Sequence, residues 1–187
     1  MDWRSLWHFG GVAVCTLWLF VFSGCAHHET QVAPVSRAGM ELHSMGKDIA
    51  DAVLSKDIER LLRYDRSDLV EEDRKFLSNP KSDLYCYLFD ASCRYNGLPS
   101  VYDVLRGAKQ LVIEVDNLGK SDDGVEHAIL LFFDGTTIDR SRLRSPDYLC
   151  EKAWKEIVSW MFRRVNGTWQ ADHSPFDAET DVLCQPD

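Results

Sequence analysis

The sequence lacks the motifs of nucleotide binding and of the common hydrolases. It contains no P-loop, no glycine-rich dinucleotide fingerprint, no HExxH and no GxSxG, so the residues that carry these four chemistries are missing. Basic residues are outnumbered, with 21 Lys and Arg against 30 Asp and Glu and a net charge of −9. A surface with this charge repels phosphate, so nucleic acid is not an expected partner.

One apolar segment, residues 9–22, lies close to the N-terminus and contains fourteen residues without a charge. A run of that length is too short to span a bilayer and is typical of the core of a signal peptide. It ends in Phe22-Ser23-Gly24-Cys25, which resembles the lipobox of bacterial lipoproteins because small residues precede a cysteine. Phe22 stands where Leu is usual. Ordinary secretion with cleavage after Ala26 is the alternative, since Gly24-x-Ala26 also fits a cleavage site.

The lipobox resemblance implies that residues 1–24 are removed and that Cys25 carries diacylglycerol, with a further acyl chain on the new amino terminus. Two or more acyl chains hold a protein durably to a membrane. Residues 25–37 then form the anchor and a flexible tether, and residues 38–187 form a single domain with an acidic C-terminal tail. Ala26 follows the cysteine in place of Asp. By resemblance to sorting in enteric bacteria, this predicts the outer membrane of a Gram-negative cell, with the domain in the periplasm.

Four cysteines remain after cleavage and lipidation: Cys86, Cys93, Cys150 and Cys184. An even number in an oxidising compartment predicts two disulfides, for which three pairings are possible. We favour Cys86–Cys93 with Cys150–Cys184, because the first pair closes a short loop and the second pins the tail. Short CxxC pairs, which a zinc site would use, are absent, so we expect neither a metal nor a cofactor.

The N-terminal part of the domain has the pattern of helices. Apolar residues recur at helical spacing over residues 38–64, and Ser55-Lys56-Asp57 interrupts them, so we expect a kink or two successive helices. Asp68 and Glu71 stand at the spacing of a capping box and predict a helix that ends before Asn79-Pro80.

Three shorter segments follow from composition and spacing. The acidic run at residues 71–73 is expected to be a solvated first turn. Residues 83–89 are short and rich in aromatics, which favours a buried strand. Residues 100–106 are expected to form one or two helical turns that stop at Gly107.

After this point the pattern predicts a meander of strands. The expected strands cover residues 111–117, 125–133, 136–140, 155–165 and 168–173, with two-residue turns at Asp134-Gly135 and Asn166-Gly167. The second turn fixes a register, in which the predicted partners are Val165 and Thr168, Arg164 and Trp169, Phe162 and Ala171, and Trp160 and His173. The face with the aromatic side chains is expected to point inward.

This order of elements predicts an α+β fold, with N-terminal helices packed on a curved antiparallel sheet and disulfides that staple it. Residues 40–173 resemble the nuclear transport factor 2-like, or cystatin-like cone, superfamily. The resemblance comes from the break at Lys56-Asp57 followed by Leu61-Leu62, the short helices before the sheet, and the final hairpin at residues 160–170. It implies a pocket between helices and sheet. Some members use this pocket for isomerase or dehydratase chemistry and many only bind or assemble, so the fold alone assigns no chemistry.

Two histidines are candidate bases in such a pocket. His127 shares a predicted strand face with apolar residues, so it is either a pocket group or a half-solvated residue at the open end of the strand. His173 is predicted to stand opposite Trp160. These residues support one hypothesis: a small pocket enzyme of the isomerase, dehydratase or hydrolase type.

Three alternating arginines, Arg140, Arg142 and Arg144, are the most distinctive polar feature. In an extended chain they project the same way and could bind an anion, such as a lipid headgroup, a cell-wall carboxylate or an acidic partner. The alternative is an edge strand that charge protects from pairing. Because no dense group of acid–base residues is present, we favour a binding or assembly module for an envelope protein or a small molecule over an enzyme.

Overall fold

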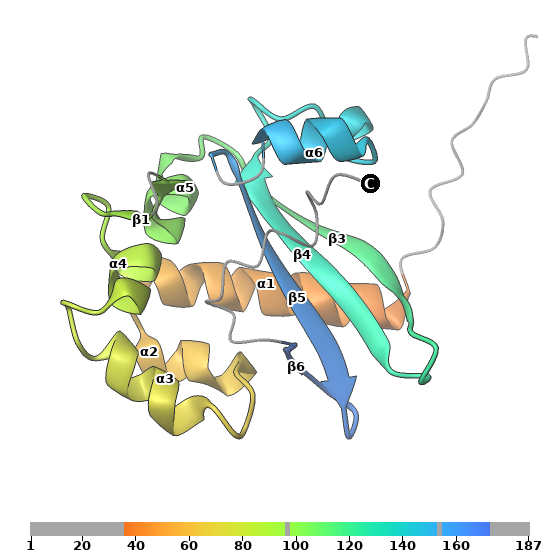
Figure 1. Cartoon of the computed structure of the whole chain (residues 1–187). Coiled ribbons are helices and arrows are strands. Elements are labelled where there is room, and N and C mark those ends of the chain that lie inside the picture. The colour runs from red at the N-terminus through yellow and green to blue at the C-terminus, as the bar shows by residue number, and fades with distance from the viewer. Residues whose placement is uncertain (1–35, 96–97, 153–154, 173–187) are drawn as a thin grey trace, which may run out of the picture. The chain divides into compact units, whose positions relative to one another are not determined.

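The computed structural model describes residues 36–95, 98–152 and 155–172 (Figure 1). Its helices are α1 (Arg37–Ser55), α2 (Ile58–Leu61), α3 (Val70–Leu77), α4 (Asp83–Phe89), α5 (Val101–Gly107) and α6 (Pro146–Lys152), with 3-10 turns η1 (Leu62–Tyr64) and η2 (Arg140–Arg142). Its strands are β1 (Arg94–Tyr95), β2 (Leu98–Pro99), β3 (Leu111–Lys120), β4 (Glu126–Asp134), β5 (Ile157–Val165) and β6 (Thr168–Ala171). The predicted α+β class is confirmed.

The main sheet is an antiparallel meander in the order β3-β4-β5-β6, and β1 and β2 form a separate small pair. The predicted register of the last hairpin is confirmed for three pairs, from Val165 with Thr168 to Phe162 with Ala171. Asn166 and Gly167 both have positive φ, 51° and 83°, as a two-residue hairpin turn requires. His173 lies outside the described residues, so its pairing with Trp160 stays a prediction.

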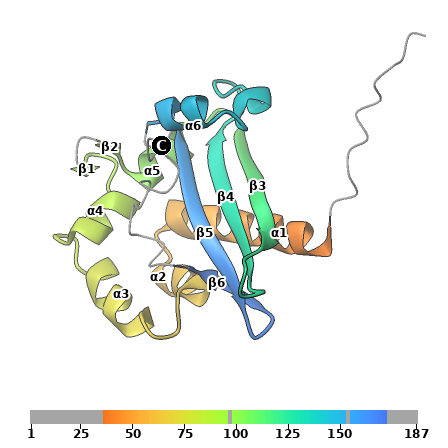
Figure 2. The same cartoon turned by 45° about the vertical axis from the view of Figure 1, so that its right-hand side comes forward.

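Helix α1 crosses one face of the sheet, called the inner face here (Figures 1 and 2). Ser36 caps the helix by accepting a hydrogen bond from the Gly39 N–H at 3.0 Å, and Lys56 ends it in the left-handed conformation at φ 56°. The predicted interruption is thus a break between two helices. Gly46 allows close packing on β3, since a Cβ there would stand 2.7 Å from Ile113 Cγ2.

Two apolar cores lie on opposite faces of the sheet, so β4 is buried on both sides. The inner core joins α1 to the inner face and includes Leu42, Ile49, Leu130, Phe132, Trp160, Phe162 and Trp169. The outer core joins the segment between β4 and β5 to the outer face and contains Ile129, Leu131, Phe133, Ile138, Leu143, Tyr148, Leu149 and Ile157. The aromatic face of the last hairpin points inward, as predicted.

The predicted strand at residues 83–89 is wrong, because this segment is helix α4. Ser82 caps the helix by accepting from the Tyr85 N–H at 3.1 Å. Tyr85 and Phe89, one turn apart, make an edge-to-face contact at 5.4 Å. The aromatic content of the segment indicated a strand. Leu88 and Phe89 are adjacent and both fully buried, which fits one side of a helix, whereas adjacent residues of a strand point to opposite faces.

The predicted hairpin into a strand at residues 136–140 is also wrong. The Asp134 carboxylate accepts hydrogen bonds from the backbone N–H groups of Lys109, Gln110 and Thr136, and these contacts turn the chain away from the sheet. Ile138 then packs into the outer core. The predicted capping box fails as well, because α3 begins after Leu69 without a side-chain cap.

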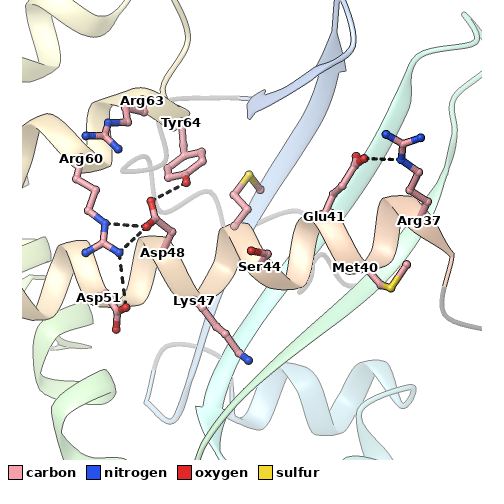
Figure 3. A pocket seen from close by; sticks show the side chains of 11 residues that line it. Arg37, Met40, Glu41, Ser44, Lys47, Asp48, Asp51, Arg60, Arg63 and Tyr64 are labelled. Carbon is pink, nitrogen blue, oxygen red and sulfur yellow. Dashed lines mark hydrogen bonds and ion pairs between the residues drawn. The ribbon is translucent and has the colours of Figure 1, made fainter.

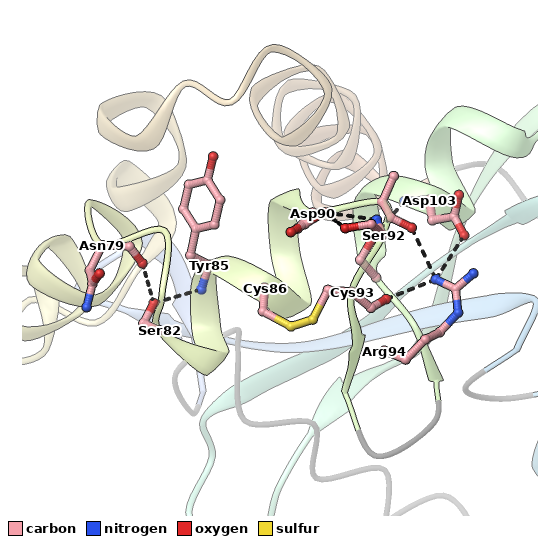
Figure 4. Close-up of a disulfide and its surroundings, with 11 residues drawn as sticks. Asn79, Ser82, Tyr85, Cys86, Asp90, Ser92, Cys93, Arg94 and Asp103 are labelled. Atoms are coloured by element: carbon pink, nitrogen blue, oxygen red, sulfur yellow. Dashed lines mark hydrogen bonds and ion pairs between the residues drawn. A yellow bond between two sulfur atoms is a disulfide. The ribbon is translucent and has the colours of Figure 1, made fainter.

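One of the two predicted disulfides is present among the described residues. Cys86 in α4 is bonded to Cys93 just before β1, with their Cα atoms 5.5 Å apart (Figure 4). The loop between them is held by the Asp90 carboxylate, which accepts from the Ser92 backbone N–H at 2.9 Å. Cys150 lies in α6. Cys184 lies outside the described residues, so its pairing with Cys150 stays a prediction.

Candidate functional site

An open hollow of about 820 Å³ lies along the solvent side of α1, where η1 and the residues of α2 fold back beside the helix (Figure 3). Four basic and three acidic side chains line it, together with a tyrosine, a serine and two methionines. The lining residues are Arg37, Met40, Glu41, Ser44, Met45, Lys47, Asp48, Asp51, Arg60, Arg63 and Tyr64. We call this feature the α1 hollow.

Asp48 is the organising residue of the α1 hollow. Its carboxylate accepts from Arg60 Nε at 2.8 Å and from the Tyr64 hydroxyl at 2.6 Å. The hydrogen bond from Arg60 holds the pKa of Asp48 below its usual range, and that from Tyr64 adds to the effect. Burial, together with the bond to Asp48, raises the pKa of Tyr64 to about 12. Asp48 therefore stays ionised and Tyr64 stays protonated through the neutral pH range. Together with Arg60 they form one side of the α1 hollow, held in place by hydrogen bonds.

Two cations of the α1 hollow, Lys47 and Arg63, form no ion pair with another described residue. Both are exposed. They lie on either side of the Asp48–Arg60 pair (Figure 3). Arg37 by contrast is paired with Glu41 at 3.1 Å. The chain has a net charge of −9. Two cations without an ion pair, next to the hydrogen-bonded group of Asp48, Arg60 and Tyr64, offer an anionic ligand charged hydrogen bonds.

The three arginines predicted to form one stripe do not share a direction, because residues 140–142 form η2 and not an extended strand. Arg140 Nε is 3.0 Å from Glu114 Oε2. The Arg142 guanidinium stacks on the Tyr148 ring at 4.2 Å from its centroid. Arg144 lines a hollow of about 470 Å³ on the outer face, whose lining also includes Glu114, Val115, Asp116, Leu131, Arg140, Ser141 and Leu143.

His127 lies on the outer face, away from α1. Its Nδ1 is 3.5 Å from Asp172 Oδ2, and Arg163 Nε is 3.4 Å from the other carboxylate oxygen. The His127 side chain is 31% exposed. A neighbouring carboxylate orients an imidazole and leaves Nε2 available, so the described geometry permits a base at this position. His173 lies outside the described residues.

Sequence reasoning missed a buried pair of carboxyl groups, Asp65 after η1 and Asp73 in α3. They are 3% and 6% exposed. Burial, followed by the hydrogen bond to Asp73, raises the pKa of Asp65 to about 7. Asp73 was expected in a solvated turn, and that expectation is wrong. The position of Leu77 could have indicated the burial of Asp73. Leu77 stands one helical turn later and is fully buried, so both residues lie on the buried side of α3.

None of the helices in the described residues is both long and apolar enough to cross a bilayer. Within the same part of the chain, no three His, Cys, Asp or Glu side chains gather in a way that could hold a metal ion. Comparison of the chain with protein-family models, with curated proteins and with solved structures found no match. The functional assignment therefore depends on the residues themselves.

Proposed function

We propose that this chain is a lipid-anchored periplasmic binding module that holds a ligand with several carboxylates in the α1 hollow. The anchor is Cys25 within Phe22-Ser23-Gly24-Cys25, the residues that resemble a lipobox. Acylation at that cysteine keeps the domain at the envelope, in this account at the periplasmic side of the outer membrane. The predicted anchor and tether cover residues 25–37, of which Ser36 and Arg37 belong to the start of α1. This segment gives the domain room to reach ligands near the membrane surface.

This proposal is carried by two cations that form no ion pair with another described residue, Lys47 and Arg63. They lie beside the hydrogen-bonded group of Asp48, Arg60 and Tyr64. A single exposed ion pair contributes only about 0.2–1 kcal/mol. A ligand therefore needs to engage both cations and the polar wall between them. This requirement selects an extended molecule with at least two carboxylates, such as a sugar–peptide fragment of the cell wall.

The proposed fold family is the cystatin-like cone. Its support is the order of elements, with helices first, a short strand pair next and a four-stranded antiparallel meander last. Leu42, Ile49, Phe132 and Trp160 pack in the space between α1 and the inner face. For this reason we assign binding to the solvent side of α1 and not to the interior of the cone.

A binding titration tests the ligand class. The probe is a soluble muropeptide, a sugar–peptide with several carboxylates, added to the mature protein and followed by calorimetry. The double substitution Lys47→Gln with Arg63→Gln is expected to weaken binding tenfold or more, since about 1.4 kcal/mol corresponds to tenfold. The control is Lys75→Gln with Lys81→Gln, two exposed lysines outside the hollow. An absence of muropeptide binding, or equal loss in both double variants, contradicts the proposal.

The alternative is a small pocket enzyme, and the Asp172–His127 pair is the observation that favours it. In that account His127 acts as the base, in an isomerase, dehydratase or hydrolase reaction on the outer face. A panel of activated esters and enolisable ketones tests it. Turnover that disappears in His127→Gln but persists in the control His43→Gln, an exposed histidine on α1, would favour the enzyme over the binding module.

A further inference from the structure

Asp65 and Asp73, called the carboxyl pair here, lie behind the α1 hollow and not in its lining. Asp65 follows η1 and Asp73 lies in α3, and they are 3% and 6% exposed. Their side chains are hydrogen-bonded to each other. This bond requires a proton on one of them, because an ionised carboxylate only accepts. No N–H or hydroxyl group of the described residues donates to Asp65 Oδ2.

The charges close to Asp65 do not balance its carboxylate. It forms no ion pair with a described cation, and the negative charge of Asp68 lies nearby. Arg66, the next residue of the chain, is bound to Asp68 at 2.7 Å, and Asp172 after β6 also attracts it. For Asp65 the shared proton therefore takes the place of a cation.

The elements that pack on η1 supply no cation to Asp65 either. Strand β6 has no ionisable side chain. In α2 Arg60 is bound to Asp48, and in α3 Arg74 is bound to Glu59. Arg163 of β5 acts on Asp68 and on Asp172. The remaining charged residues of α3 are exposed: Glu71, Glu72 and Lys75. A change of pH therefore acts on the carboxyl pair through its own proton.

The 3-10 turn η1 connects the carboxyl pair to the α1 hollow. The backbone N–H of Asp65 donates to the carbonyl oxygen of Leu62 at 3.3 Å and closes the turn. Tyr64, the residue before Asp65, donates to Asp48 at 2.6 Å. Arg63, one residue earlier, is an exposed cation of the hollow. Figure 3 shows both side chains next to the Asp48 carboxylate.

Loss of the shared proton leaves two negative charges in contact, away from water, and they repel each other. Leu62 at the start of η1 and Leu77 in α3 are buried in the inner core, so neither end of this unit moves readily. Residues 63–66 between them are less firmly held, because Arg63 is exposed and Arg66 is half-buried. Movement of this segment toward solvent relieves the repulsion. The same movement lengthens the bond from Tyr64 to Asp48 and displaces Arg63.

We propose that the carboxyl pair is a pH-sensitive switch that holds η1 in its binding position while protonated and releases the ligand of the α1 hollow when ionised. This inference rests on the proposed function, since the ligand is the molecule with several carboxylates assigned to the hollow. Burial raises the pKa of Asp65 to about 7, so the change falls between pH 5.5 and pH 8. Carboxylates of a muropeptide stay ionised throughout that range. By linkage, a bound ligand also raises the proton affinity of the pair.

Hydrogen exchange of the backbone amides of residues 62–66 in the mature protein tests the movement of η1 without a ligand. The reference is Asp65→Asn, because the amide of Asn donates to Asp73 at every pH, and comparison at one pH removes the intrinsic effect of pH on exchange. Wild type is expected to exchange several-fold faster than Asp65→Asn at pH 8 and at a matching rate at pH 5.5. Asp73→Asn is the second variant and is expected to behave as Asp65→Asn. Strand β5 is the internal control, with unchanged exchange.

Calorimetric titration with the soluble muropeptide at pH 5.5 and pH 8 tests the effect on binding. Wild type is expected to bind several-fold more tightly at pH 5.5. Asp65→Asn is expected to bind equally at both pH values, with the affinity that wild type has at pH 5.5. The control is His43→Gln on α1, because histidine is the residue type that ordinarily gains charge in this range. This variant is expected to keep the pH dependence.

Three results would overturn the switch. They are equal exchange of residues 62–66 in wild type and Asp65→Asn at pH 8, the same pH dependence of muropeptide binding in these two proteins, and a pH dependence that disappears in His43→Gln. Absence of muropeptide binding at both pH values contradicts the proposed function instead. In that case the exchange rates alone decide whether the carboxyl pair moves η1.

Discussion

Replacement of Asp65 by Asn is the substitution whose effect the structure defines most fully. Asp65 is 3% exposed and shares its site with the carboxyl of Asp73. Its Oδ1 accepts the Arg66 backbone N–H at 2.7 Å, and an Asn at this position keeps that acceptor. The amide is neutral at every pH, so Asp65→Asn removes the charge of one carboxyl with little change in shape.

The direction in which the free energy of unfolding changes with pH follows from proton binding to Asp65. Burial raises the pKa of Asp65 from 3.8 to about 7, so the folded protein holds a proton that the unfolded chain loses between those values. The free energy of unfolding therefore falls as pH rises through this window, and the contribution is fully present below pH 4. Each pKa unit corresponds to about 1.4 kcal/mol, so the loss between pH 4 and pH 8 is about 2 to 4 kcal/mol.

Urea unfolding from pH 4 to pH 8 measures this effect as the difference between Asp65→Asn and wild type. The variant is expected to match wild type near pH 4 and to exceed its stability at pH 8 by about 2 to 4 kcal/mol. Asp68→Asn is the control, because the hydrogen bond from Arg66 lowers the pKa of exposed Asp68. That variant is expected to lose stability at neutral pH and not at low pH. A stability difference for Asp65→Asn that does not change with pH would contradict the raised pKa of Asp65.

Three further substitutions test the packing and the turn chemistry. Gly46→Val drives a side chain into Ile113, which a Cβ already approaches at 2.7 Å, and is expected to cost about 1–3 kcal/mol in urea unfolding; unchanged stability would refute the close approach of α1. Phe162→Ala empties a site that is 1% exposed and is expected to cost about 3–5 kcal/mol, whereas a loss under about 1 kcal/mol would show that the inner core is loose. Asp134→Ala removes a carboxylate whose pKa its bonds to the Lys109 and Thr136 N–H groups lower to about 2. Its destabilisation is expected to be complete at neutral pH and to shrink below pH 4, and a constant penalty down to pH 2 would contradict the assignment.

The sequence predicted the register of the last hairpin correctly for the three pairs that the structure describes, because the information that sets this register is local. Asn166-Gly167 accepts two positive φ angles at low cost, and this turn sets every pair that follows. The break after Ser55 was also local, since Lys56 and Asp57 end one helix and cap the next. Both features need no knowledge of distant residues.

The features that escaped prediction depend on contacts between distant residues. Asp134 turns the chain by binding N–H groups 24 and 25 residues earlier, at Gln110 and Lys109, so Asp134-Gly135 resembled a hairpin and is not one. Asp48 meets Arg60 only because the break folds α2 back on α1. The α1 hollow therefore could not be assembled from periodicity alone.

The predictions of a common direction for the three arginines and of an exposed Asp73 were wrong for the same reason. Alternation at Arg140, Arg142 and Arg144 implies a common face only in a strand, and η2 separates them. Asp73 sits in an acidic run that suggests solvent, but the packing of α3 buries it beside Asp65. The composition of a segment indicates its average exposure to solvent. The exposure of each side chain depends on how neighbouring elements pack against the segment.

The lipid anchor and the two disulfides are both tested by the intact mass of the protein purified from its native membrane, measured before and after reduction with alkylation. The expected result is a chain that begins at Cys25, carries acyl mass, and gains four alkyl groups only after reduction. Those groups belong to Cys86, Cys93, Cys150 and Cys184. A chain that begins after Ala26 and lacks acyl mass, or that takes alkyl groups before reduction, would contradict the anchor or the disulfides.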